Sequence, residues 1–312
     1  MHVVVASHHR LPVEGYGGPQ RVVVALVRGL AALGHRVTVL AQPGTRVSEA
    51  AKIVEVAPRV LKDPGAGDLK RFIPDSADIM HAHFPMKQAP KGIPFVQTLH
   101  GNWKPETPLP PNTIFLSRDH ARRHGSTLYV HNGLDPAEYI FRGRKEKWDL
   151  FLGKLHSDRG YQWAVEAAKR TERQLIIAGG WRPSFTGGIK YVGEVDGKRK
   201  AVLLARARCL WMPAQWDEPF GLPIIEALFS GTPVVGTRRG ALPEIVTPAV
   251  GVLRDTLDEL ISASEKVSEL DPRACRERAE RQFTHIKMAE SYVRMYEAVL
   301  KTGALPAALG AA

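Results

Sequence analysis

Short apolar runs alternate with amphipathic stretches along most of the chain. Residues 2–7 (HVVVAS) form a β-branched run between polar residues, which is typical of a strand buried on both faces. Pro19 suits the first turn of a helix, and apolar residues then recur at helical spacing as far as Gly34, a C-terminal cap. Residues 36–41 (RVTVLA) form the next strand. The pattern predicts a strand–helix–strand unit at the start of the chain.

The same alternation runs to about residue 140, pauses and then restarts. Before the pause, further strands are predicted at 52–57, 78–81, 94–99, 113–117 and 127–130. Residues 131–136 (HNGLDP) have the chemistry of a turn, and a charged run follows at 142–147. After it, strands are predicted at 148–153, 174–178, 208–212 and 233–236, and helices at 161–170, 201–207, 222–230, 257–267 and most of 272–300. The predicted fold class is α/β, with two parallel-sheet domains.

The composition narrows the class of protein. With 312 residues, 44% hydrophobic and 24% charged, the chain is typical of a two-domain globular protein, which excludes disordered and fibrous classes. No apolar run reaches the ~18 residues that a membrane span needs. Two cysteines, Cys209 and Cys275, cannot build a disulfide framework, so a reducing cytoplasm is the expected location.

The chain carries a net charge of +11, which both halves share. A single basic stripe of the kind that binds nucleic acid is not visible, so no nucleic-acid partner is expected. An anionic substrate fits the charge, and so does peripheral association with an anionic membrane. A basic, solvated surface without any partner explains the charge equally well.

The strongest chemical signal is residues 217–227 (DEPFGLPIIEA), where two carboxylates, Glu218 and Glu226, stand eight residues apart across a loop-to-helix junction. Gly221 lets backbone approach a ligand, and the amides of the helix that follows form a site for phosphate. Glu226 lies one turn inside the helix among apolar residues, so it needs donors, which sugar hydroxyls would provide. Taken alone, Glu226 is better explained as an acid that satisfies the helix dipole.

The segment from Glu218 to Ala227, continued by 231–235 (GTPVV) and 240–246 (GALPEIV), resembles the signature of retaining glycosyltransferases of family 4. The resemblance implies the GT-B fold, two Rossmann-like domains that face a central cleft. It covers nearly the whole chain. It implies an acceptor-side domain at 1–140, a nucleotide-sugar-binding domain at 141–285, and a helix within 286–312 that packs back toward the first domain and ends in a frayed tail.

The resemblance also assigns roles within the Glu218–Glu226 segment. Glu218 would face the donor sugar, and Glu226 would hold the nucleotide ribose. The backbone amides of Gly221 and Leu222 would face the sugar and the diphosphate, and Phe220 would line the same site. One departure from the family pattern is Ala214, where the family often has Ser, so one hydroxyl contact is missing.

Residues 153–160 (GKLHSDRG) follow a strand and open a helix, so the cations Lys154 and Arg159 can bracket a diphosphate. The family usually places Arg first and Lys second, and this chain has the reverse order, which alters the fork geometry but keeps both charges. Without that context, two surface cations would be the ordinary explanation. Residues 191–195 resemble the loop under the nucleotide base, which makes Val195 a candidate contact.

Gly17 and Gly18 resemble the N-terminal glycine pair of the family, whose amides face the donor phosphate or the acceptor. A dinucleotide-binding fold is disfavoured because residues 15–20 (GYGGPQ) lack the GxGxxG spacing. His100 follows a strand and resembles a family histidine that approaches the donor sugar. Trp103, close by, is either an acceptor platform or a packed loop aromatic.

His81 and His83 point to one side of a strand and look like a metal pair, but no third ligand is evident, so a structural role is favoured. We therefore expect no metal and no cofactor. The expected activity is retaining transfer of a sugar from a UDP- or GDP-sugar to a hydroxyl acceptor, with His100 and Glu218 as catalytic residues. The alternatives are a GT-B-fold nucleotide-sugar epimerase, which needs no acceptor, and a non-catalytic protein that binds sugar nucleotides or nucleic acid.

Overall fold

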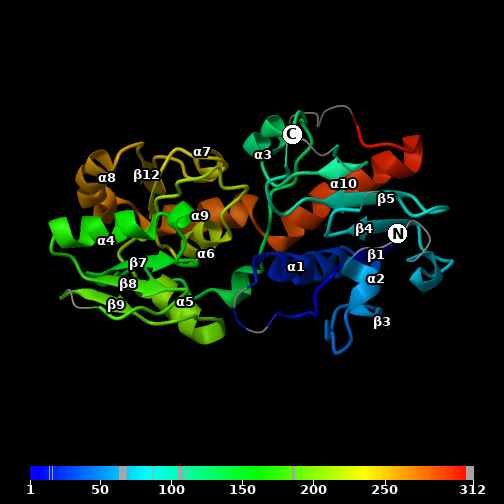
Figure 1. The fold of residues 1–312 in the computed structure, drawn as a ribbon, viewed down its shortest axis with the longest axis horizontal. Helices are drawn as coiled ribbons and strands as arrows, with labels where there is room; N and C mark the ends of the chain where they lie inside the picture. The colour runs from blue at the N-terminus through cyan, green and yellow to red at the C-terminus, as the bar shows by residue number, and fades with distance from the viewer. Residues whose placement is uncertain are drawn as a thin grey trace. The chain divides into compact units, whose positions relative to one another are not determined.

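The computed structural model describes residues 1–13, 15, 17–62, 69–86, 88–104, 108–109, 111–184 and 187–306. These residues form two units (Figure 1), each built on a six-stranded sheet whose strands all run parallel. The first unit holds residues 1–13, 17–134 and those from 284 onward, and the second holds residues 135–283. The prediction of two parallel-sheet α/β domains is confirmed.

The first unit has the strand order β3-β2-β1-β4-β5-β6. Its elements are β1 (His2–Ala6), α1 (Gly18–Ala32), β2 (Arg36–Ala41), β3 (Lys52–Glu55), α2 (Pro58–Lys62), the 3₁₀ turn η1 (Lys70–Phe72), β4 (Ile79–Ala82), β5 (Phe95–Thr98), β6 (Thr113–Ile114), α3 (Arg118–Arg123) and α10 (His285–Thr302). The order reverses between β1 and β4, and ligands of open α/β sheets bind at the carboxyl ends of the strands at such a switch point. Residues 127–130, predicted as a strand, contribute only an isolated bridge between Phe115 and Tyr129.

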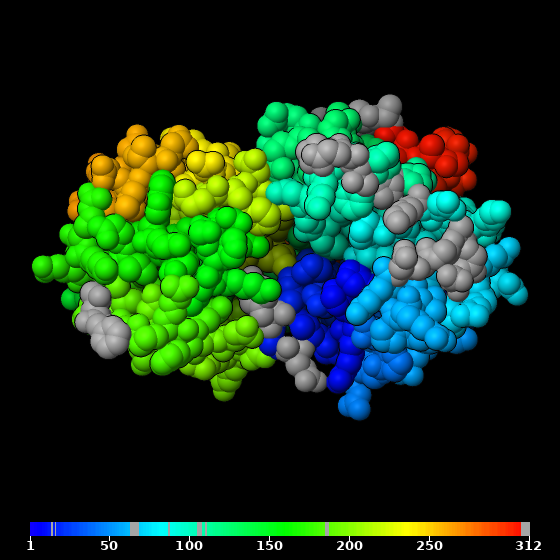
Figure 2. Space-filling view, in the orientation of Figure 1, coloured from blue at the N-terminus to red at the C-terminus, as the bar shows by residue number. Residues whose placement is uncertain are grey.

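The last described helix, α10, packs along α1 and against β5 of the first unit. Gly29 of α1 makes this close approach possible, because a Cβ there would stand 2.8 Å from the Cβ of Ala289. In Figure 2 the red end of α10 lies beside cyan segments that are far from it in sequence. This is the helix that the family resemblance expects to return to the first domain. The tail expected to fray falls beyond residue 306, outside the described residues.

The second unit has the order β12-β11-β10-β7-β8-β9, which is the same topology with its switch point between β7 and β10. Its elements are η2 (Pro136–Glu138), β7 (Asp149–Leu152), η3 (Ser157–Arg159), α4 (Tyr161–Arg170), β8 (Leu175–Ala178), β9 (Ile189–Tyr191), α5 (Gly197–Arg206), β10 (Leu210–Met212), α6 (Leu222–Phe229), β11 (Val234–Gly236), α7 (Leu242–Ile245), β12 (Gly251–Leu253), α8 (Leu257–Ser264), η4 (Glu265–Glu269) and α9 (Pro272–Gln282). The edge strands β9 and β12 were not predicted. Lys190 interrupts β9 and Gly251 opens β12, so neither forms the continuous apolar run expected of a buried strand.

The boundary between the units falls between Leu134 and Asp135, earlier than the predicted position after residue 140. The reason is the packing of the connecting segment. The ring of Tyr139 stacks on Phe229 with centroids 5.4 Å apart. Gly231 leaves room for the ring of Phe141, since a Cβ on Gly231 would come within 2.8 Å of it. Residues 135–141 therefore belong to the second unit.

Lys145 fixes the ends of two helices in the second unit. Its Nζ donates hydrogen bonds to the carbonyls of Ala205, in the last turn of α5, and Ser230, the C-cap of α6, both at 2.9 Å. A third bond, at 2.8 Å, goes to Oγ1 of Thr232. Burial lowers the pKa of Lys145 to about 8. A cation at two helix C-termini is electrostatically favourable, so Lys145 holds α5 and α6 in register.

Candidate active site

At the switch point of the second sheet, the loop after β7 packs against the loop after β10. Gly160 ends the first of these loops with φ +71°, and a Cβ at this position would overlap the carbonyl oxygen of Pro213. The amide of Gln215 also donates to the carbonyl of Asp158 at 2.7 Å. Because only glycine fits this approach, Gly160 brings the side chains of the two loops together.

The two loops join Arg159 to Glu218. The Arg159 guanidinium donates a short hydrogen bond to Oε2 of Glu218 and lies over the ring of Trp216, 4.7 Å from its centroid. The indole Nε1 of Trp216 donates to the same oxygen at 3.1 Å. From the sequence, Arg159 is predicted to contact the diphosphate and Glu218 the donor sugar. The pairing of the two side chains was not predicted.

Glu218 is buried, with 6% of its surface exposed. Burial raises the pKa of this carboxyl above its usual value, while Arg159, Trp216 and the backbone N–H groups of Phe220 and Gly221 act in the opposite direction. The amide of Gly221, which the family resemblance directs toward the donor, is thus turned to the Glu218 carboxylate. The site holds one buried carboxylate surrounded by donors.

A turn around Gly240 supports the backbone of Glu218. Gly240 has φ +57°, and a Cβ there would overlap the backbone nitrogen and oxygen of Glu218. The next residue, Ala241, donates its N–H to the Glu218 carbonyl at 2.9 Å. This contact gives residues 240–246 of the signature a physical role, because they form the surface on which the Glu218 loop rests.

Glu226 lies in α6 with 2% of its surface exposed. Its Oε1 accepts from Nζ of Lys200 at 2.8 Å and from the hydroxyl of Tyr139 at 3.1 Å. The expectation that sugar hydroxyls must supply its donors is therefore corrected, since the protein supplies them. Lys200 was missed because it belongs to the basic run 198–200 (KRK), which has the sequence signature of a solvated surface.

The remaining candidates of this unit differ in exposure. Lys154, after β7, is exposed, and Val195, between β9 and α5, is half-buried. Leu222 is the first residue of α6, whose N-cap is Gly221 with φ +90°. The ring of Phe220 is buried against Phe283, with centroids 6.0 Å apart. The side chain of Phe220 therefore belongs to the core, and a substrate contact of this residue stays a prediction.

In the first sheet, imidazoles gather at the carboxyl ends of β4 and β5, beside the switch point. His83 follows β4 and His100 follows β5, and Nδ1 of His83 lies 2.9 Å from Nε2 of His100. His81 is fully buried, and its two nitrogens contact the Tyr296 hydroxyl at 2.7 Å and Oγ1 of Thr98 at 2.8 Å. The structural role predicted for His81 is therefore confirmed, whereas His83 contacts a candidate catalytic residue.

These imidazoles are neutral at pH 7. Burial lowers the pKa of His81 to about 3 and that of His100 to about 4, and it holds the pKa of His83 well below its usual value. His8 and His9, in the loop after β1, lower the pKa of His100 further by electrostatic repulsion. Gly17 and Gly18 lie at the start of α1, where Gly17 is the N-cap and a Cβ on it would stand 2.7 Å from Val13.

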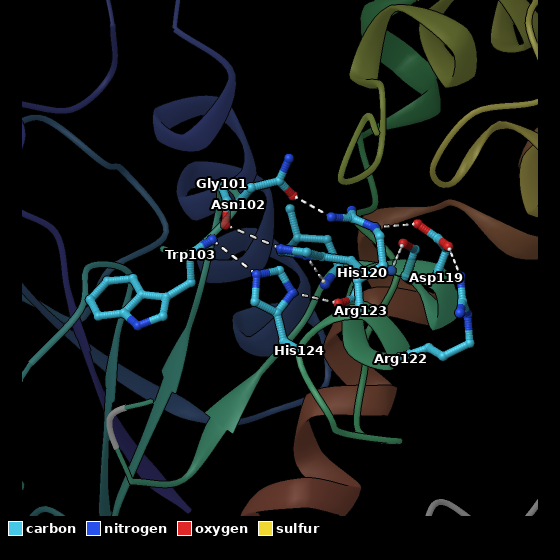
Figure 3. A network of polar contacts seen from close by, with 10 residues as sticks. Gly101, Asn102, Trp103, Asp119, His120, Arg122, Arg123 and His124 are labelled. Carbon is cyan, nitrogen blue, oxygen red and sulfur yellow. Dashed lines mark hydrogen bonds and ion pairs between the residues drawn. The ribbon is translucent and has the colours of Figure 1, made fainter. Parts of the chain in front are cut away.

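The loop that carries His100 is fastened to α3 (Figure 3). Nε2 of His120 lies 3.1 Å from the carbonyl oxygen of Gly101, and the amide of Trp103 donates to Nε2 of His124 at 2.9 Å. Arg123 donates to the side chain of Asn102 at 3.1 Å. Trp103 packs on the small apolar cluster around Phe115. Of the two roles open for Trp103, the structure shows the packed loop aromatic.

Two family models match consecutive parts of the chain. The model described as "Glycosyltransferase Family 4" matches residues 16–135, and "Glycosyl transferases group 1" matches residues 146–270. The chain belongs to the glycosyltransferases of the family 4 type. The family resemblance drawn from the Glu218–Glu226 segment is thereby confirmed. The roles of the two carboxylates stay predictions.

Solved structures agree with this GT-B glycosyltransferase assignment. AviGT4, a glycosyltransferase involved in avilamycin A biosynthesis, is 28% identical, and the match covers 96% of this chain and 98% of that one with a TM-score of 0.81. HepE of Anabaena in complex with UDP-glucose shares the fold at 14% identity and a TM-score of 0.69, over 96% of this chain and all of that one.

Among curated relatives, the glycogen synthase of Mycobacterium tuberculosis is 27% identical over 201 residues, which are 54% of this chain and 47% of that protein. The glycosyltransferase chain therefore spans about half the length of the curated relatives that it matches. Within the part of the chain that the structure describes, no group of three or more His, Cys, Asp or Glu side chains is arranged to hold a metal ion. No helix of that part is both long and apolar enough for a membrane span.

Proposed function

We propose that this glycosyltransferase moves a sugar from a nucleotide-diphosphate sugar, a UDP- or GDP-sugar, to a hydroxyl acceptor, with retention at the anomeric carbon and without a metal ion. The observation that carries the proposal is the Arg159–Glu218 pair beside the N-terminus of α6. The same topology in the Anabaena protein binds UDP-glucose, which supports a nucleotide-sugar donor here.

The chemistry follows from where charge develops. When the bond between sugar and phosphate breaks, negative charge grows on the departing diphosphate and positive charge grows on the sugar ring. Lys154, Arg159 and the first amides of α6 would stabilise the diphosphate, and the helix amides and the Arg159 guanidinium are held in place before the reaction begins. Together they would provide the electrostatic stabilisation that a divalent ion supplies in other enzymes.

Glu218 would act on the sugar side of this separation. Burial favours its protonated form, and the Arg159 guanidinium favours the carboxylate. A carboxylate held in a site with little water interacts strongly with a positively charged sugar ring. Glu226, held by Lys200 and Tyr139, would contact the ribose hydroxyls of the nucleotide, as the family resemblance implies. His100 would orient the donor sugar, as the family resemblance implies.

Thermal unfolding in the presence of candidate donors tests the donor site. UDP-, GDP- and ADP-sugars are added to the full chain, and the cognate donor is expected to raise the melting temperature because it binds only the native state. The Arg238→Ala variant is a matched control, since Arg238 pairs with Asp255 at an exposed position of the same unit. A shift with the wild type and with Arg238→Ala, but not with Lys154→Ala/Arg159→Ala, supports the donor site. Equal shifts in all three proteins would contradict its placement.

Turnover then tests the reaction itself. The first product is analysed by NMR in excess EDTA, with the donor alone and with hydroxyl acceptors. We expect an acceptor-dependent product with the anomeric configuration of the donor. A rearranged sugar nucleotide without acceptor would identify an epimerase, and an inverted product would remove the retaining mechanism. Turnover that EDTA abolishes and Mg²⁺ or Mn²⁺ restores would contradict metal independence.

A further inference from the structure

His83 has one ring nitrogen engaged and one isolated. The side chain is 4% exposed, and its Nδ1 lies 2.9 Å from Nε2 of His100, with the two rings stacked at 5.2 Å between centroids. Nε2 of His83 is buried and has no hydrogen-bond partner among the described residues. Buried polar atoms are nearly always paired, so this isolated nitrogen constrains where the protons are.

Neighbouring contacts hold the ring of His83 and the backbone that follows His100. His83 packs between the ring of His81, 4.1 Å away, and that of Tyr292, 6.4 Å away. His81 is itself held by Tyr296 and Thr98. The loop after His100 is fastened by His120 and His124 through its backbone (Figure 3). With both backbones fixed, the His83–His100 contact sets the orientation of the His100 ring.

Two neutral imidazoles can share this contact in two ways. If His100 donates from Nε2, then His83 carries its own proton on Nε2, where an N–H group is buried without an acceptor. If His83 donates from Nδ1, its isolated nitrogen is an unprotonated lone pair, and His100 carries its proton on Nδ1. Buried N–H groups without a partner are rarer than incompletely satisfied acceptors, which favours the second arrangement.

We propose that His83 is a positioning residue that donates its Nδ1–H to Nε2 of His100 and thereby leaves His100 with a proton on Nδ1, directed to an oxygen of the substrate. His100 is half-buried, so a ligand can reach it. In this tautomer His100 is a neutral hydrogen-bond donor that orients an oxygen of the sugar or diphosphate. It cannot serve as the base that takes the acceptor proton, because its only lone pair is occupied by His83. This inference rests on the proposed function.

The groups that face the pair are themselves compatible with neutral rings. His8 and His9 approach His100 from the loop after β1, and His81 approaches His83 from β4. The tyrosines of α10 present hydroxyls rather than charges, because burial raises the pKa of both Tyr292 and Tyr296 above the usual value of a tyrosine. The groups that act on the pKa of the two rings are neighbouring histidines, and together with burial they disfavour an imidazolium.

The proton positions can be measured directly on the wild-type chain without substrate. In ¹⁵N-histidine-labelled protein at pH 7.5, the ring nitrogens of His100 are assigned by comparison with His100→Gln. We expect Nδ1 of His100 to be protonated and Nε2 to be unprotonated. For His83 we likewise expect a proton on Nδ1 and the chemical shift of an unprotonated nitrogen at Nε2. A proton on Nε2 of His100 would overturn the proposal whether or not the chain is a transferase, so this failure is distinct from failure of the proposed function.

Kinetics test the consequence for the reaction. His83→Asn places an amide near the position of Nδ1, whereas His83→Gln places it near Nε2. We expect His83→Asn to keep kcat within about 3-fold, and His83→Gln to lower kcat about 10-fold or more with KM for the donor nearly unchanged, as expected when a group is misoriented. His2→Gln is the matched control, because His2 is buried at the opposite end of β1 and bonds to Thr38 and Ser76. Equal losses in His83→Asn, His83→Gln and His2→Gln would show a merely structural role.

Discussion

The two sheets have the same strand order but carry different chemistry at their switch points. In the first unit the carboxyl ends of β4 and β5 present neutral imidazoles, whose pKa values burial depresses. In the second unit the loops after β7 and β10 present the ion pair of Arg159 with Glu218, and the helices α5 and α6 carry a second pair, Lys200 with Glu226. Neutral groups orient a ligand by where their protons are, and ion pairs respond to the charge of a ligand. The comparison suggests that one site sets geometry and the other stabilises charge.

The largest expected effect is a loss of folding stability at acid pH, caused by the buried histidines of the first unit. The folded-state pKa values of His81 and His120 are about 3, and that of His83 is also well below the value of 6.5 in the unfolded chain. Below pH 6.5 the unfolded chain therefore binds more protons, and stability is lost as the pH falls toward the folded pKa values. Each histidine contributes up to about 1.4 kcal/mol per pH unit.

Urea unfolding at pH 7.5 and pH 5.5 measures this loss, above the range where carboxylates titrate. The loss of stability should be nearly independent of salt concentration, because the histidine pKa values are lowered by burial rather than by exposed charges. An unfolding free energy that is the same at the two pH values would contradict the assignment of these rings as buried and neutral.

The next effect concerns the buried pair of the second unit. Lys200→Met leaves the Glu226 carboxylate without its cation, and removing one partner of a buried pair costs about 3–5 kcal/mol. The double variant Lys200→Met/Glu226→Gln should recover much of that stability, because no charge is left unpaired. Arg238→Met, at an exposed pair, should cost no more than about 1 kcal/mol. A Lys200→Met variant as stable as Arg238→Met would show that the pair is solvated.

Glu218→Gln should lower turnover about 100-fold, roughly 3 kcal/mol in the barrier, while changing affinity for the free nucleoside diphosphate little. Glutamine keeps the size of the side chain but removes the charge that would face the sugar, and in the proposed arrangement the diphosphate would not contact that charge. Steady-state kinetics and calorimetry separate the two quantities. A variant that loses nucleotide affinity but keeps turnover would place Glu218 on the nucleotide rather than on the sugar.

The smallest effects should distinguish the two cations. Lys154→Ala and Arg159→Ala should each weaken nucleoside diphosphate binding by about 1–3 kcal/mol. Only Arg159→Ala should also move the acid limb of the turnover profile to higher pH, because the guanidinium lowers the pKa of Glu218. Identical pH profiles for the two variants would mean that the Arg159–Glu218 pair does not persist during turnover.

Much of the fold was predictable because strands of a parallel sheet are buried on both faces and read as apolar runs. The Glu218–Glu226 segment was predictable for a similar reason, since its chemistry lies within eleven consecutive residues. The strands β9 and β12 were missed because Lys190 interrupts one and Gly251 opens the other, so neither reads as a continuous apolar run. Phe220 was predicted to line the donor site, and the burial of its ring against Phe283 was not predicted, because an aromatic residue in an apolar segment suits a site and a core equally well.

The pairings within the sites could not be predicted. Arg159 and Glu218 lie 59 residues apart, and Tyr139 and Glu226 lie 87 apart, so only the packing of loops and helices reveals that they meet. His83 and His100 are separated in the sequence by the whole of β5, so their contact was not predicted. For His83 the sequence suggested only a metal pair or a structural role. The residue types indicated the chemistry of each site, but the hydrogen-bond and ion-pair partners of each residue could be identified only from the folded structure.

The return of α10 to the first unit has a consequence for synthesis of the chain. Tyr292 and Tyr296 of α10 complete the hydrogen bonds of Thr98 and His81, and α10 covers α1. On the ribosome, residues 135–283 emerge before α10 does, so the second unit has its full sequence while the first still lacks a helix of its core. Domains usually fold in the order of their synthesis. Here the unit that begins first must finish last, with its imidazoles and the inner face of α1 uncovered while the second unit is made.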